Sequence, residues 1–90
     1  MSFVPKDLSV LSYANGFTLW HYATVDAAAA IDTEGYFDDA SHMLRAGDMI
    51  MANVDTDGET PGAGLFLVSS NTGGVVDVDD LTSVGGTDTD

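Results

Sequence analysis

The chain has 90 residues, no cysteine, and 15 acidic residues against Lys6 and Arg45, which gives a formal net charge of −13. A chain of this length forms one domain with a small core, and without cysteine it has neither disulfides nor thiolate metal ligands. The charge repels phosphate backbones and anionic lipid surfaces, so it argues against nucleic-acid binding and membrane-surface binding.

Residues 1–12 form an apolar N-terminal segment without a clear period, in which Pro5 interrupts any helix. Phe3, Val4 and Leu8 give this segment too much apolar content for a disordered tail. Two interpretations stay open. The segment is either an edge strand packed on its own domain or an arm that docks on a neighbouring molecule.

The dipeptide Asn15-Gly16 predicts a turn, and Phe17 to Val25 predicts a strand rich in aromatic and β-branched residues. Both faces of this strand carry apolar side chains, so it is either buried on both sides or presents one face to a partner. Trp20 and Tyr22 lie on one face and are candidate interface anchors, with a core role as the alternative.

The stretch from Asp26 to Glu34 predicts a turn or irregular segment, with Asp32 or Thr33 able to cap a following helix. Apolar residues then recur at helical spacing, which predicts a helix over residues 37–46 that ends before Gly47. Residues 48–54 predict a further strand.

Residues 55–64 predict a loop from their Gly, Pro and Asp content. Residues 63–70 predict a strand that is apolar on both faces, with Phe66 and Val68 on one of them. An Asn71 to Gly74 turn joins it to a strand that begins at Val75. We therefore expect a mainly β domain with one short α-helix, in a small barrel or sandwich-like arrangement over residues 13–84, followed by a frayed acidic tail over 85–90.

Recognisable catalytic motifs are missing from the sequence, which favours a protein that is not an enzyme and needs no cofactor. The loop over residues 55–62 begins with alternating carboxylates, as a calcium loop does, but its glycine comes too early for an EF-hand. We expect a solvated acidic loop there and no metal site. His21 and His42 lack metal-ligand spacing. The sequence also shows no signal peptide and no apolar run of about 20 residues, so we expect synthesis in a cytoplasm.

Spaced residues over most of the chain resemble a family of small virion head proteins from tailed bacteriophages and gene transfer agents. The residues that carry the resemblance are Trp20–Thr24, Asp26–Ala28, Gly35–Phe37, Met43–Leu44, Gly47–Ile50, Gly73, Val75–Val78, Leu81 and Gly85–Asp90. The resemblance implies a capsid decoration (cement) protein or the base of a head fibre or spike. The resemblance implies no catalytic residues in this chain.

From this resemblance we expect a decoration protein that binds the major capsid protein on the outer surface of a phage head, as a homotrimer. No receptor-binding domain follows Asp90, which favours decoration over a spike base. A head-fibre or spike base, a tail component, and a small acidic calcium-dependent binding module stay as alternatives. The side chains expected at interfaces are Phe3, Val4, Leu8, Trp20, Tyr22, Phe66 and Val68.

Overall fold

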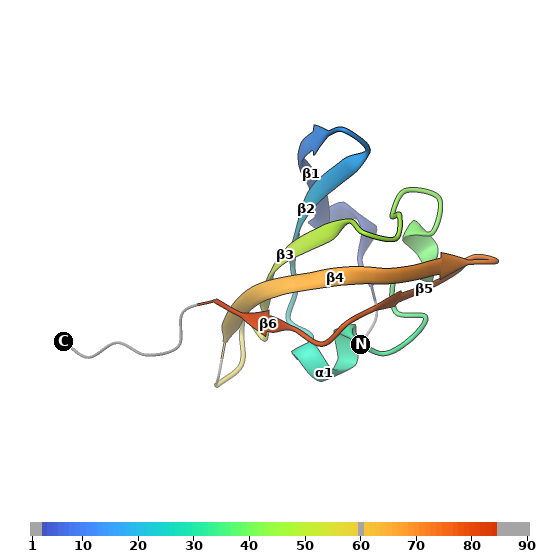
Figure 1. Cartoon of the computed structure of the whole chain (residues 1–90). Helices are drawn as coiled ribbons and strands as arrows, with labels where there is room; N and C mark the ends of the chain where they lie inside the picture. Colours follow the sequence, from blue (N-terminus) through green and yellow to red (C-terminus); the bar gives the residue numbers. More distant parts are fainter. Residues whose placement is uncertain (1–2, 60, 85–90) are drawn as a thin grey trace.

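A computed structural model describes residues 3–59 and 61–84 as a single open sheet with short helices on one side of it (Figure 1). Its strands are β1 (Leu8–Ala14), β2 (Phe17–Ala23), β3 (Met49–Val54), β4 (Gly62–Thr72), β5 (Val75–Val78) and β6 (Thr82–Ser83). Its helices are η1 (Pro5–Asp7), α1 (Ala28–Ile31) and η2 (Asp38–Ala40), of which only α1 is an α-helix. This arrangement confirms the prediction of a mainly β domain with one short α-helix.

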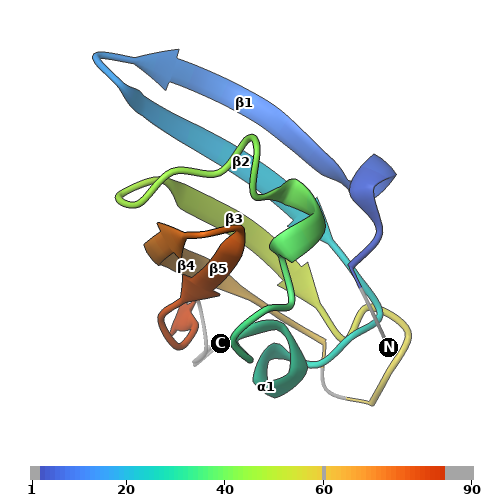
Figure 2. The ribbon, with the colours of Figure 1, turned by 90° about the vertical axis from the view of Figure 1, so that its right-hand side faces the viewer.

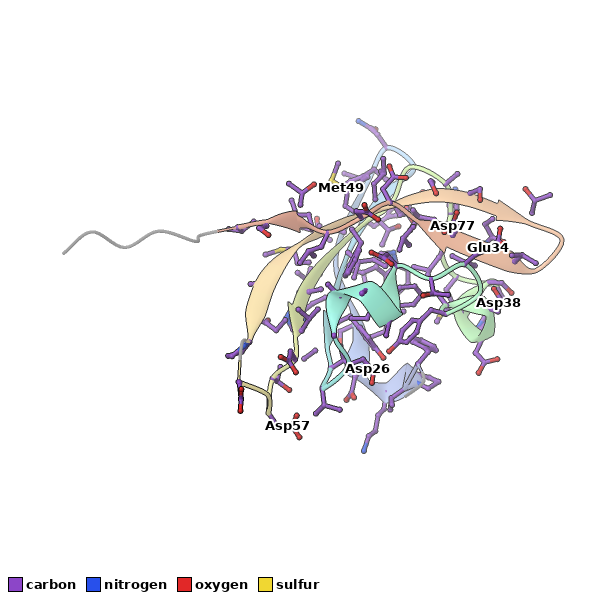
Figure 3. All side chains as sticks on the ribbon, turned by 90° about the horizontal axis from the view of Figure 1, so that it is seen from below. Asp26, Glu34, Asp38, Met49, Asp57 and Asp77 are labelled. Atoms are coloured by element: carbon purple, nitrogen blue, oxygen red, sulfur yellow. The ribbon has the colours of Figure 1, made fainter. Side chains whose placement is uncertain are left out.

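The sheet is mixed, with the strand order β1-β2-β3-β4-β5 and with β6 paired to the first part of β4. All neighbouring strands run antiparallel except β2 and β3, which are parallel. Parallel neighbours need a crossover connection, and residues 24–48 supply it. This crossover contains α1 and η2 and covers one face of the sheet (Figures 1 and 3).

The core lies between this crossover and the covered face of the sheet. Successive strand residues point to opposite faces, and cross-strand pairing aligns Trp20, Ile50 and Phe66 in one row on the covered side. Ile31, Phe37 and other apolar residues of the crossover pack on them and complete a single buried cluster.

Both predicted hairpin turns are confirmed. Asn15 and Gly16, between β1 and β2, have φ values of +53° and +81°, and Gly73 and Gly74, between β4 and β5, have +62° and +84°. Consecutive residues with positive φ form the two-residue turn whose twist matches that of antiparallel strands. Asparagine and glycine are the residues that tolerate this conformation best.

The predicted helix over residues 37–46 is wrong. Only η2 is helical there, and successive turns follow it up to Met43. Side-chain hydrogen bonds favour the turns over a regular helix: Asp38 Oδ1 accepts from the Val76 N–H at 2.9 Å, and Asn71 Nδ2 donates to carbonyl groups of residues 41 and 44. The apolar pattern was nevertheless informative, because Phe37, Ala40 and Leu44 are all buried.

The α-helix that does form was predicted as an irregular stretch. It is one turn long, over residues of which three are alanine, the residue with the best helix propensity. Thr33 does not cap a following helix: its hydroxyl donates back to the Ala29 carbonyl at 3.1 Å. Asp32 instead lies at the C-terminal end of α1.

Candidate protein interface on the open face of the sheet

The face of the sheet opposite the crossover is apolar and uncovered by any described element. We define the open face as the outward residues of the three central strands. They are Phe17, Leu19 and His21 of β2, Met49, Met51 and Asn53 of β3, and Ala63, Leu65 and Leu67 of β4. Figure 3 shows Met49 on the side of the sheet away from α1, whereas Asp26 and Asp38 lie on the same side as α1.

Strand register assembles these side chains into continuous rows. Leu19 pairs with Met49, and Met49 pairs with Leu67, so one row crosses β2, β3 and β4. The adjacent row runs from His21 through Met51 to Leu65. Directly opposed side chains on neighbouring strands contact each other, so these rows form one surface.

This surface is hollowed as well as apolar. A cavity of about 510 Å³ extends over it from Phe17 to Val84. Methionine lines its centre, and this unbranched, polarizable side chain adapts its shape to a partner. Phe17, Met49, Met51 and Leu67 remain partly exposed, at 37–42% of their surface.

The open face contains no charged residue, although the chain carries 15 acidic ones. Asp79 and Asp80 border a smaller hollow beside Met49 and Leu67. An uncharged apolar centre with charge at its rim is the usual composition of a protein–protein interface.

One polar pair interrupts the apolar surface. His21 Nε2 lies 3.0 Å from Asn53 Oδ1 at an exposed position. An amide oxygen can only accept a hydrogen bond, so in this pair His21 donates from Nε2.

The structure places most of the predicted interface residues elsewhere. Trp20, Tyr22, Phe66 and Val68 are buried in the domain's own core and have no surface for a partner, so the interface prediction is wrong for them. The sequence showed two apolar faces on these strands, and the face that we assigned to an interface is the one buried in the core. The crossover packs on the face that carries Trp20, Tyr22 and Phe66, and these large aromatic side chains bury much apolar area there.

Phe3 and Leu8 also pack on the domain itself. Phe3 is 7% exposed, and its ring centroid lies 5.5 Å from that of Tyr22 and 5.3 Å from that of Phe37. Leu8 is half-buried at the start of β1 and packs against the same core. The interpretation of a docking arm is therefore wrong for Phe3 and Leu8. Val4, the third residue of this segment that was expected at an interface, is 36% exposed.

Two buried carboxylates hold the loops around the core. Asp48 accepts hydrogen bonds from the Thr18 and Arg45 backbone N–H groups, both at 3.1 Å, and from Trp20 Nε1 at 3.3 Å. Asp26 accepts from the Tyr36 hydroxyl at 2.6 Å. Burial raises the pKa of Tyr36, and its hydrogen bonds to Asp26 and Tyr22 raise that pKa further, so Tyr36 stays protonated as the donor.

Within residues 3–59 and 61–84, no group of three or more histidine or acidic side chains is arranged to hold a metal ion. None of the described helices has the length and apolar content needed to cross a membrane. The predicted acidic tail, residues 85–90, lies outside the described part of the chain.

Comparisons of the chain with protein-family models, with curated proteins and with solved structures find no match.

Proposed function

We propose that this protein is a capsid decoration protein that binds the major capsid protein on the outer surface of a phage head through its open face. The observation that best supports a docking role is the open face, which is apolar, uncharged and uncovered in a chain of net charge −13. Removing apolar surface from water favours association, so such a face favours a protein partner. The choice of a phage head rests on the sequence resemblance.

The distribution of charge suits a protein that is made in many copies in the host cytoplasm and then assembled on a particle. Acidic side chains outside the open face favour the solubility of the free protein. Because the open face itself holds no charge, its burial against a capsid subunit requires no desolvation of a carboxylate or ammonium group. Occupied sites then bridge neighbouring capsid subunits and stabilise the shell.

A head-fibre or spike base would use the same face, and the number of copies bound per particle distinguishes it from a decoration protein. The homotrimer expected from the sequence stays a prediction. A calcium-dependent binding module is the alternative from another class, and it differs by requiring calcium for binding.

Replacing Met51 by lysine tests the proposal. Met51 is 42% exposed at the centre of the open face, so the variant should fold, but docking would bury an unpaired charge. We expect affinity for DNA-free capsids of the same phage to fall by roughly 30-fold or more, the scale of a central interface residue. Co-sedimentation with capsids measures this, with and without a calcium chelator.

The matched control is Val75→Lys, because Val75 has nearly the same exposure, 41%, and lies on β5 outside the open face. It should bind capsids as the unmodified protein does. Equal binding by both variants would exclude the open face as the docking surface. Loss of binding in the presence of the chelator would favour the calcium-dependent alternative.

A further inference from the structure

His21 is the one titratable side chain among the residues that define the open face. It lies on β2, which Figure 2 shows between β1 and β3. Histidine is the side chain whose charge ordinarily changes between pH 5 and 8, whereas carboxylates stay ionised over most of this range. The charge of the open face near neutral pH therefore depends on a single proton.

The described strands beside His21 present no charged group to it. Its cross-strand neighbours are Ser9 on β1 and Met51 on β3. The titratable side chain of β1 is that of Tyr13, which pairs with Thr18 and so lies on the opposite face of the sheet. β3 and β4 contain no titratable residue.

The carboxylates next to these strands in sequence lie beyond the strand ends. They are Asp7 before β1, Asp48 before β3 and Asp55 after β3, and Asp48 is buried. Asp79 and Asp80 border the smaller hollow described above. None of these residues belongs to the open face, so a proton gained by His21 is not neutralised by a carboxylate within it.

The hydrogen bond to Asn53 determines which nitrogen of His21 gains the proton. Asn53 Oδ1 accepts from His21 Nε2 at 3.0 Å, so Nε2 carries its hydrogen in the neutral ring. The second proton is therefore added at Nδ1. Protonation leaves the pair with Asn53 in place and adds one positive charge to an apolar surface.

We propose that docking on the open face requires the neutral form of His21, so that affinity for the partner decreases as the pH falls through the range in which histidine titrates. Docking removes His21 from water, and an imidazolium without a paired carboxylate is costly to bury. The docked protein therefore binds this proton less readily than the free protein, and protonation opposes docking. This inference rests on the proposed docking role and adds how that role is regulated.

Co-sedimentation of His21→Gln with DNA-free capsids tests the requirement. Glutamine is polar and stays neutral at every pH used. Docking that excludes the protonated ring weakens by about tenfold between pH 7.5 and pH 5.5, for a histidine that titrates near its ordinary value of about 6.5. We expect this loss for the unmodified protein and a much smaller loss for His21→Gln.

The matched control is His42→Gln, because His42 is the other histidine of the chain and is exposed in the crossover. This variant removes the same kind of group from a position outside the open face, so it should keep the full dependence on pH. Titration of the capsid is common to all three proteins. It cancels when the ratio of affinities at the two pH values is compared between them.

A neutral apolar dye, N-phenyl-1-naphthylamine, tests the free protein without capsids. The cavity of about 510 Å³ on the open face has the size of a small-ligand site, and His21 lines it. Dye fluorescence should report weaker binding at pH 5.5 than at pH 7.5 for the unmodified protein and for His42→Gln. His21→Gln should bind the dye equally at both pH values.

The two measurements separate this inference from the capsid role. Where capsids bind, equal pH ratios for the unmodified protein and His21→Gln would overturn the requirement for neutral His21 and leave the capsid role intact. Tighter binding at pH 5.5 that His21→Gln abolishes would overturn it too, because a partner carboxylate would then face His21.

Where capsids do not bind, the capsid role fails and the dye decides. A pH ratio for the dye that depends on His21 would support the inference, and equal ratios would overturn it. Absence of binding of both capsids and dye would show that the open face is not a binding surface, and would overturn both proposals.

Discussion

At the scale of single residues, Asp48 shows how one buried side chain joins distant parts of the chain. Its carboxylate satisfies donors from the start of β2 and from the loop before β3, and its own carbonyl accepts from the Val68 N–H at 2.8 Å. A sequence alone does not reveal this role, because an aspartate beside a glycine is equally common in exposed turns.

Replacing Asp48 by alanine should be among the most destabilising single changes in this protein. It would leave the Thr18 N–H and Trp20 Nε1 buried without an acceptor, at a cost of about 1–3 kcal/mol for each donor. A domain of this size has a free energy of unfolding of only about 5–14 kcal/mol. Urea denaturation measures the loss, and Trp20, the only tryptophan, supplies the fluorescence signal.

Asp39→Asn is the control for charge removal, because Asp39 is exposed in η2. Its unfolding midpoint should stay close to that of the unmodified protein, as for most surface substitutions. A midpoint for Asp48→Ala equal to that of the control would contradict the role assigned to this carboxylate.

At the scale of elements, β2, β3, β4, β5 and the two hairpin turns were predictable, whereas β1, β6 and the crossover were not. The strand over residues 17–25 and the two hairpin turns depend on local signals, namely β-branched and aromatic residues and the dipeptides at residues 15–16 and 73–74. The crossover depends on contacts between residues far apart in sequence. Asn71 and Val76, on strands that follow it, hold residues 38–44 in turns, and no local pattern reports those partners.

The open face illustrates a related limit. Alternation within β2 and β4 separated two sets of side chains correctly, but both sets were apolar. Which set turns inward is decided by the crossover that packs on it and by the aromatic cluster of Phe3, Tyr22 and Phe37. Without the position of the crossover, the sequence could not distinguish the core from the candidate interface.

The end of α1 gives a prediction that depends on pH. Partial burial raises the pKa of Asp32 above its ordinary value of 3.8, and Asp80 and then Asp77 raise it further. The folded state therefore binds this proton more readily than the unfolded state does. It follows that the ionised Asp32 destabilises the fold at neutral pH, and that this penalty disappears as the pH falls below 3.8.

Asp32→Asn should accordingly raise the melting temperature at pH 7 by about 2 °C, the scale of a favourable surface-charge change in a small domain. The increment should shrink as the pH is lowered toward 4. Thermal melts by circular dichroism across that range measure it. An increment that is constant with pH would show that the benefit comes from something other than the charge on Asp32.

At the scale of the whole molecule, Phe3 near the start of the chain belongs to the core of the domain. Phe3 packs on Tyr22 of β2 and on Tyr36 and Phe37 of the crossover, while the Val4 N–H donates to the Tyr22 hydroxyl at 3.0 Å. The Tyr22 hydroxyl is also hydrogen-bonded to the Tyr36 hydroxyl, and the Tyr36 hydroxyl donates a hydrogen bond to Asp26. One aromatic and polar network therefore joins the start of the chain, the central sheet and the crossover.

Phe3→Ala tests whether this network is essential to the fold. Loss of a buried phenylalanine costs roughly 3–5 kcal/mol, a large share of the stability of a 90-residue domain. We expect a much lower urea midpoint, and we expect a chain that begins at Leu8 to lose cooperative unfolding altogether. Val4→Ala is the matched control, because the neighbouring Val4 side chain is 36% exposed and its truncation should change the midpoint little. A Leu8-initiated chain that folds with an unchanged midpoint, yet no longer sediments with capsids, would restore the separate docking arm that the buried position of Phe3 argues against.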